Sequence, residues 1–267
     1  MSAGAAEGEE GGLVCAHCGS PLPEGAEECG VCDGGLAAVA PPEEAPAAPA
    51  EPAEMTPESS RRFHYFEIAL VLGVGFLWAV IYSLRAWWSN RGLSPETELG
   101  SLDRILDAGL SISVLAYVLY WQGRSLRTLG LIFRRSDLVW AVVIVGFDWL
   151  MMMAIRQNVR GLAWKHFPVG TVGPLQWLAV IPSAAKEELI VRAFLMTEVA
   201  ELSGSWALAV LTSVGFQTIY HLYQGTPAAL MAAGGFFVSA VFYASTRRIT
   251  PVILAHSLHN FWIMASW

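Results

Sequence analysis

The sequence has few charged residues, and it contains no cysteine after residue 32. Only 15% of its 267 residues are charged, whereas 54% are hydrophobic and the mean hydropathy is +0.46. A soluble domain usually carries about 25% charged residues. The composition therefore argues against an ordinary soluble protein and indicates a membrane protein.

Basic residues are missing from the first 60 positions. That stretch holds 12 of the 23 acidic residues, whereas the rest of the chain carries 16 basic and 11 acidic residues, a formal charge of +5. The opening "MSAGAAEGEEGG" is acidic and has no apolar core, so it does not fit a secretory signal peptide. We expect residues 1–12 to be disordered, the first hydrophobic segment to act as a signal-anchor, and no nucleic acid among the partners.

The four cysteines form two C-x2-C pairs separated by ten residues. They are Cys15, Cys18, Cys29 and Cys32. Two such pairs supply four thiolates at a spacing that can close tetrahedrally around Zn²⁺. The pattern resembles the zinc ribbons at the ends of many bacterial membrane proteins, and we predict a structural zinc ribbon over residues 13–34. The alternatives are two disulfides, which need an oxidising compartment, or a redox site, for which one pair would suffice.

A linker is predicted between this ribbon and the apolar part of the chain. Residues 35–60 contain six prolines, and their charged residues are all acidic. Proline and like-charge repulsion extend such a segment, and it has no means to bury a core. We therefore assign it no secondary structure and begin the membrane domain at residue 61.

Apolar runs long enough for membrane helices recur from residue 61 to residue 267. A span needs roughly 20 helical residues. The expected spans are 64–84, 104–122, 137–155, 173–198, 206–222, 227–246 and 251–267. The sequence thus predicts an all-α polytopic membrane protein of about seven transmembrane helices.

Arginines in the short loops predict the orientation of these spans. Three loops rich in arginine fall on one side if the N-terminus is cytoplasmic: before the first span, between the second and third, and between the sixth and seventh. Basic residues accumulate on the cytoplasmic side. We expect a cytoplasmic N-terminus, where reduced thiols favour zinc over disulfides.

The stretch "AAKEELIVRAF" places four ionisable residues inside an apolar run. Each would cost about 2.5–3.5 kcal/mol at a bilayer centre. Glu188 and Arg192 are spaced i,i+4, so they can form an ion pair on one helix face. Glu187 lies about 100° around the helix from that face. Lys186 either pairs with Glu187 or extends toward the membrane surface.

Further polar residues in two later spans are candidates to meet Glu187. His221 ends "GFQTIYH", and His256 and Asn260 share one face of the last span, whereas His259 lies on another. An acid, two imidazoles and a carboxamide suit a centre that activates water and stabilises an oxyanion. One difficulty is depth, because full-length spans would separate His221 from His256 by about 12 Å along the membrane normal. Glu67 and Asp148 also lie in apolar surroundings, and the sequence identifies no partner for either acid.

These motifs, in this order, resemble the CPBP family, the CAAX-prenyl-endopeptidase and bacteriocin-processing (Abi-type) intramembrane proteases. The resemblance covers roughly residues 125–267. It implies that Glu187 activates water, that His221 assists it, and that His256 and Asn260 stabilise the oxyanion. It makes Glu188 and Arg192 the structural pair beside Glu187.

One position departs from the family pattern, which normally has Phe four residues before the histidine where this chain has Gln217. Family members are often called metalloproteases. Glu187 and the two histidines can ligate Zn²⁺ by residue type, but the sequence contains no H-E-x-x-H motif. Whether catalysis uses a metal stays open at this point.

The resemblance implies an intramembrane endopeptidase that cleaves lipidated or membrane-tethered peptides. The zinc ribbon joined to this membrane domain leads us to expect a protein of the bacterial cell membrane. In a bacterium, prenylated CAAX proteins are not the expected natural target. Two non-proteolytic alternatives stay open. One is a membrane scaffold whose zinc ribbon recruits a protein partner, and the other is a proton or solute pathway lined by Glu187 and the histidines.

Overall fold

The computed structural model describes residues 57–89, 98–158 and 173–265. The chain divides into two units, Met1–Glu54 and Met55–Trp267. The predicted zinc ribbon with its four cysteines, the disordered residues 1–12 and most of the linker lie outside the described residues, so they stay predictions. Every regular element of the described part is a helix, which confirms the all-α prediction.

Helices occur where each of the seven spans was predicted. The elements are α1 (Pro57–Ser89), α2 (Glu98–Trp121), α3 (Ser136–Asn158), α4 (Pro174–Glu187), η1 (Glu188–Phe194), α5 (Leu195–Ser203), α6 (Trp206–Tyr220), η2 (Leu222–Gln224), α7 (Thr226–Thr246) and α8 (Thr250–Ala265). The segments α4, η1 and α5 follow one another without a break and correspond to the fourth predicted span.

The predicted linker boundary was wrong by four residues, because α1 already begins at Pro57. Proline is well suited to the first turn of a helix, where its missing N–H would have no intrahelical partner. Residues 57–60 therefore belong to the helix rather than to an irregular linker.

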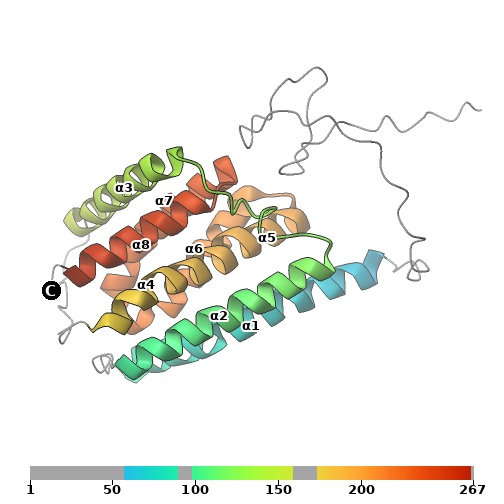
Figure 1. Ribbon diagram of the computed structural model, residues 1–267, viewed down its shortest axis with the longest axis horizontal. Helices are drawn as coiled ribbons and strands as arrows, with labels where there is room; N and C mark the ends of the chain where they lie inside the picture. Colours follow the sequence, from blue (N-terminus) through green and yellow to red (C-terminus); the bar gives the residue numbers. More distant parts are fainter. Residues whose placement is uncertain (1–56, 90–97, 159–172, 266–267) are drawn as a thin grey trace, which may run out of the picture. The chain divides into compact units, whose positions relative to one another are not determined.

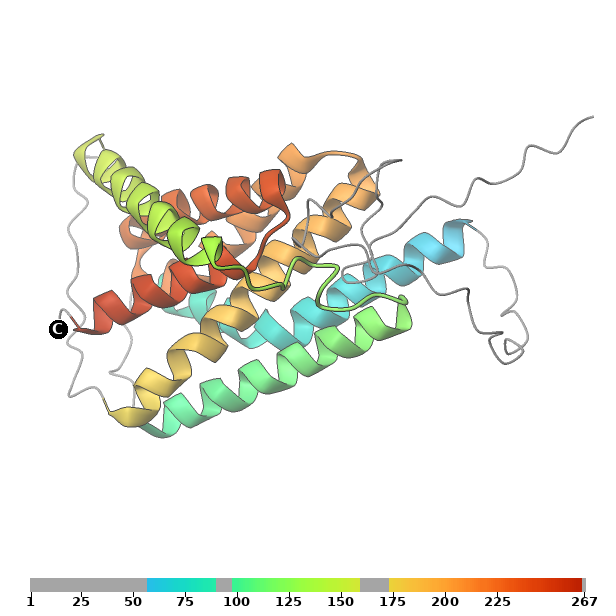
Figure 2. The same ribbon diagram turned by 45° about the horizontal axis from the view of Figure 1, so that its top comes forward.

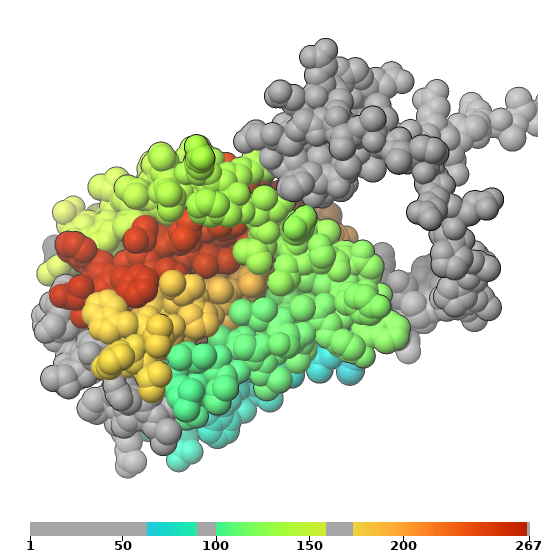
Figure 3. All heavy atoms as spheres, viewed as in Figure 1, coloured from blue at the N-terminus to red at the C-terminus, as the bar shows by residue number. Residues whose placement is uncertain are grey.

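The α4–η1–α5 segment lies in the middle of the helical unit. α1 and α2 pack side by side next to it, and α3, α7 and α8 form a second group on its other side, as Figures 1 and 2 show. On the face drawn in Figure 3, α8 lies between α3 and α4, and α4 lies between α8 and α2. Helices far apart in sequence thus enclose the motif-bearing segment.

Helix α3 has the side-chain distribution of a lipid-facing helix. Its buried residues are Asp137, Ala141, Ile144 and Asp148, which recur at helical spacing on one face. Its exposed residues include Val139 and Leu150, which are 65% and 66% exposed. Since the apolar side chains point outward and the acids point inward, this face fits a bilayer rather than water.

Three helices of the described residues are long and apolar enough to cross a membrane. They are Phe63–Ser89 within α1, Ser136–Asn158 and Thr226–Thr246. The helix Trp206–Tyr220 is apolar but shorter. This supports an integral membrane protein, whereas the crossing of the bilayer by all seven segments stays part of the proposal below.

The central segment changes from α-helix to π-helix at the predicted motif. Residues Glu188–Phe194 form η1, and all seven of them are buried. Pro182, which cannot donate a backbone hydrogen bond, lies inside α4 shortly before this change. Short π-helical stretches are often found at functional sites. Here the π-helix carries both Glu188 and Arg192.

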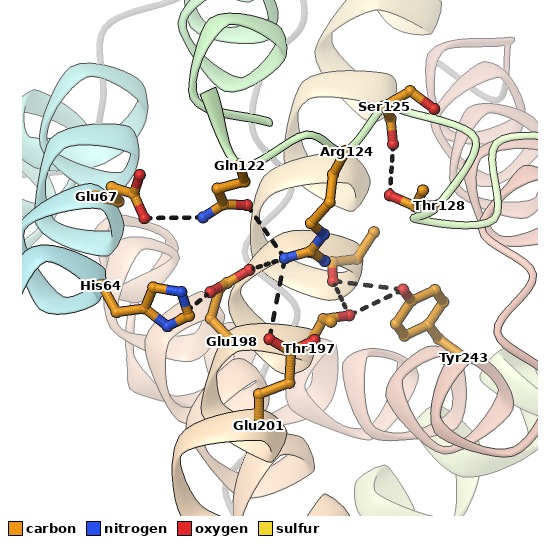
Figure 4. Close-up of polar contacts among 11 residues, drawn as sticks. His64, Glu67, Gln122, Arg124, Ser125, Thr128, Thr197, Glu198, Glu201 and Tyr243 are labelled. Atoms are coloured by element: carbon orange, nitrogen blue, oxygen red, sulfur yellow. Dashed lines mark hydrogen bonds and ion pairs between the residues drawn. The ribbon is translucent and has the colours of Figure 1, made fainter. Parts of the chain in front are cut away.

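A separate polar cluster fastens α1 and α2 to α5 (Figure 4). At its centre the Arg124 guanidinium donates to Glu198 at 2.6 Å, and His64 approaches the other Glu198 oxygen at 3.6 Å. Gln122 donates to Glu67 at 2.8 Å, which gives Glu67 the partner that the sequence did not identify. This Glu198 cluster links α1, α5 and the segment that follows α2.

Candidate active site

One cavity of about 260 Å³ brings together most of the predicted site residues. Its walls come from α3, η1, the end of α6, α7 and α8. The ionisable and amide side chains that line it are Asp148, Glu188, Arg192, His221, Gln224, His256, His259 and Asn260. The sequence separated these groups by up to 112 positions, and the fold gathers them around one volume large enough for a substrate side chain.

Glu188 is the buried anchor of the site. The carboxylate lies 3.5 Å from Nε of Arg192, as the i,i+4 spacing predicted, and its other oxygen is 2.7 Å from Nδ1 of His256. A carboxylate without a proton only accepts hydrogen bonds, so Nδ1 of His256 carries the hydrogen. Glu188 thus does more than the predicted pairing, because it also fixes the ring of His256.

Gln217, the departure from the family pattern, occupies the middle of this network. It is fully buried, and its amide oxygen accepts a hydrogen bond from Arg192. Its amide nitrogen donates to Glu187 at 3.4 Å. The guanidinium of Arg192 also lies over the ring of Phe236, with its central carbon 5.4 Å from the ring centre. Gln217 therefore bridges the structural pair to Glu187.

Glu187 is held from α6 rather than from its own helix. The Tyr220 hydroxyl donates to Glu187 Oε2 at 2.9 Å, and Gln217 donates to the same oxygen. Glu187 also interacts electrostatically with His256 and His221. Both donors bind the same carboxylate oxygen, and Glu187, unlike His221, His256 and Asn260, is not among the residues that line the cavity.

Lys186 is paired with α2, not with Glu187. Its ammonium group lies 2.5 Å from Asp107 and donates to the Gly75 carbonyl at 3.0 Å. It also lies 4.6 Å from the centre of the Phe76 ring. Of the two roles expected for Lys186, direct pairing with Glu187 is wrong, because the ion pair is formed with Asp107, and only a longer electrostatic interaction with Glu187 remains.

His221 reaches the cavity because α6 ends at Tyr220. His221 caps the helix, and its Nδ1 makes a 2.9 Å hydrogen bond to the Gln217 carbonyl four residues earlier. The ring is therefore turned back toward the preceding helical turn, and it lines the same cavity as His256. A carbonyl cannot donate, so Nδ1 carries the hydrogen and Nε2 is left as an acceptor.

The last helix contributes two further groups to the cavity. Asn260 lines the wall four residues after His256, as their shared face predicted. His259, which was expected on another face, lines the same cavity, and its ring centre is 6.5 Å from that of Trp149. The cavity is wide enough around α8 that both faces of this helix border it.

The donor set does not fit a bound metal ion. Within residues 57–89, 98–158 and 173–265, no three His, Cys, Asp or Glu side chains are grouped so that they could hold one. In both rings Nδ1 is engaged, in His256 by Glu188 and in His221 by a carbonyl, so that one nitrogen of each ring remains.

Comparison with known families gives one match. Residues 169–262 match the family model described as Rce1-like, type II CAAX prenyl endopeptidase Rce1-like. This match supports the CPBP family for that segment. No curated protein and no solved structure matches the chain. The CPBP assignment confirms the resemblance read from the motifs, over a shorter stretch than residues 125–267.

Sequence reasoning missed the groups that position Glu187. Tyr220 was overlooked because it directly precedes His221 in an apolar run, where an aromatic ring usually indicates packing. Gln217 was noted only as a departure, although a polar side chain inside "SVGFQTIY" needs a hydrogen-bonding partner when it is buried. That requirement was the signal that could have pointed to a network.

Proposed function

We propose that the CPBP cavity hydrolyses a peptide bond, with Glu187 as the general base that activates water. The observation that carries the proposal is the environment of Glu187. Two donors from α6 orient its carboxylate, and it interacts with both His221 and His256, the histidines that line the cavity. A carboxylate fixed in this way beside two cavity histidines can remove a proton from a water molecule held between them.

His221 supports the transfer of that proton. Its Nε2 has a free lone pair on the cavity side of the ring. Water gives its proton to Glu187, and the resulting hydroxide attacks the carbonyl carbon of the peptide bond. The proton then passes to the leaving amine, directly or through Nε2 of His221, so that one water molecule is consumed and a carboxylate and an amine are released.

His256 and Asn260 stabilise the oxyanion of the tetrahedral intermediate. Since Nδ1 of His256 donates to Glu188, Nε2 can donate only when the ring is protonated. The Glu188 carboxylate stabilises this imidazolium, and Arg192 and Gln217 fix Glu188 and Glu187 relative to each other. Asn260 supplies a neutral N–H donor. Two donors facing the developing negative charge lower the barrier most in a site shielded from water.

The substrate in this proposal is a lipidated or membrane-tethered peptide. The apolar exterior of α3 and the three candidate spans support a cavity that is reached from the bilayer. We further propose that all seven helical segments cross the membrane, with the N-terminus in the cytoplasm of a bacterial cell. With this orientation, the predicted zinc ribbon lies on the cytoplasmic side. Its four cysteines bind the zinc ion, and the ribbon can recruit a protein partner there.

The proposal is tested with purified protein in liposomes and a library of lipid-anchored peptides. We expect the wild-type protein to release peptide fragments, and Glu187→Gln to slow release by about 10²–10⁴-fold. Glu201→Gln is the matched control, because Glu201 is half exposed in the Glu198 cluster. Equal release by wild type and Glu187→Gln would favour the scaffold or pathway alternative.

A further inference from the structure

A second acid borders the cavity, and it comes from helix α3. Asp148 lies in the middle of the apolar helix α3 and is only 7% exposed. It borders the same cavity as Arg192 and His256, yet its Oδ1 accepts no hydrogen bond from the described residues. The proposed hydrolysis does not use this carboxyl group, and a buried acid in a membrane helix is a candidate for a functional residue.

The other buried acid of α3 shows that the helix otherwise satisfies its carboxylates. Asp137 accepts a hydrogen bond from the Arg134 backbone N–H at 2.8 Å and is paired with Arg248. Asp148 follows 11 residues later, about 16 Å further along the helix. The arginine that pairs with Asp137 is therefore out of reach of Asp148.

A glycine of α7 allows close packing against α3 near Asp148. A Cβ atom on Gly234 would lie 2.7 Å from side-chain atoms of Met151 and Ile155, whereas one on Gly235 would lie 3.5 Å from Cγ of Asp148, an ordinary contact. The missing side chain of Gly234 lets α3 approach α7 closely. Asp148 therefore lies directly against the α7 wall of the cavity at Gly235.

The charges that line the cavity leave Asp148 as the carboxylate without a direct cation. Asp148 and Glu188 are the two acids of the lining, and Arg192 is its arginine. Glu188 is paired with Arg192 and His256, whereas no ion pair joins Asp148 to a side chain of the described residues. A cation at Oδ1 would supply the missing pair, which a neutral amide N–H would not.

We propose that Asp148 is a specificity-determining residue that binds a positively charged substrate side chain, the amine of lysine or the guanidinium of arginine, close to the cleaved bond. This inference rests on the proposed peptidase function. The cavity of about 260 Å³ accommodates such a side chain, and the ion pair forms in a place from which water is largely excluded, where a charge-assisted hydrogen bond is strong.

The test compares peptides that differ only at lysine. Lipid-anchored peptides with lysine at each position around the cleavage site are matched with peptides that carry acetyl-lysine, which keeps the shape of lysine but removes its charge. For wild-type protein we expect kcat/KM at one position to be roughly 10- to 100-fold higher with lysine. In Asp148→Asn this ratio falls to about 1–3, while cleavage of the acetyl-lysine peptide is retained.

The matched control is Asp103→Asn, since Asp103 is exposed on α2 and its change should leave the ratio as in wild type. If wild-type protein cleaves lysine and acetyl-lysine peptides equally at every position, the inference is overturned whether or not Asp148→Asn folds. A ratio that survives in a folded Asp148→Asn protein also overturns it. A wild-type protein that cleaves no peptide contradicts the proposed function itself, and the inference falls with it.

Discussion

Replacing Gln217 by methionine tests whether this residue connects the two halves of the site. Methionine has a similar volume and is also unbranched, so the substitution removes the amide without a large change in packing. It deletes the hydrogen bond from Arg192 and the donor to Glu187. Arg192 is 1% exposed, so no bulk water replaces the lost partner.

The expected loss of stability follows from the two contacts. A hydrogen bond to a charged group contributes about 1.5–3 kcal/mol, and the longer contact to Glu187 adds roughly 0.6 kcal/mol, the average for side-chain pairs in a membrane protein. Arg192 keeps Glu188 and Phe236, so we expect a total of about 2–3 kcal/mol. For a chain of this size that corresponds to a Tm lower by roughly 5–10 °C.

Thermal unfolding in detergent, followed by tryptophan fluorescence, measures this change. Gln157→Met is the matched control, because Gln157 is exposed at the end of α3, and we expect its Tm to stay within about 1–2 °C of wild type. A Tm of Gln217→Met that equals the control value would refute the role of Gln217 as the buried partner of Arg192.

Three further changes follow from the same structure. Tyr220→Phe removes the 2.9 Å hydrogen bond to Glu187 and should lower kcat roughly 5- to 10-fold with little change in KM. The control Tyr117→Phe, at an exposed tyrosine, should leave both constants unchanged. Equal kcat values for Tyr220→Phe and wild type would contradict the role of Tyr220 in positioning Glu187. Arg124→Gln leaves Glu198 buried without its main cation, so we expect a free energy of unfolding about 1–3 kcal/mol lower in chemical denaturation. The control is Arg135→Gln, at an exposed arginine. If both variants lose the same stability, the Glu198 cluster does not have the stabilising role described above. Gly130→Ala places a Cβ 1.8 Å from the Arg247 carbonyl oxygen at a φ of +81°, so the protein should accumulate poorly or have a Tm far below that of wild type. The control Gly109→Ala, whose Cβ meets open space, should have a Tm close to that of wild type. A normal Tm for Gly130→Ala would contradict the close contact between this loop and Arg247.

The sequence predicts the local contacts of the site well. The ion pair between Glu188 and Arg192 follows from their i,i+4 spacing, and the shared face of His256 and Asn260 follows from the same helical period. The helices themselves were predictable because long apolar runs are punctuated by residues such as Gly204, which caps α5 at a φ of +67°. These features depend only on neighbours in the chain.

Contacts between helices were not predictable in the same way. Tyr220 donates a hydrogen bond to Glu187 across 33 positions of sequence, and Lys186 pairs with Asp107 across 79 positions. Which side chains meet is decided by how the helices are rotated and how closely they approach. The π-helix of η1 adds a further difficulty, because its hydrogen-bond pattern differs from the 3.6-residue period on which the sequence analysis relied.

The central claim is that Glu187 activates the water molecule that cleaves the peptide bond. The most direct measurement is hydrolysis of a lipid-anchored peptide in water enriched in the heavy oxygen isotope, with products analysed by mass spectrometry. We predict that wild-type protein places one heavy oxygen in the new carboxylate, and that Glu187→Gln forms this labelled product about 10²–10⁴-fold more slowly. Labelled product formed by Glu187→Gln at the wild-type rate, or a wild-type product without heavy oxygen, would contradict the claim.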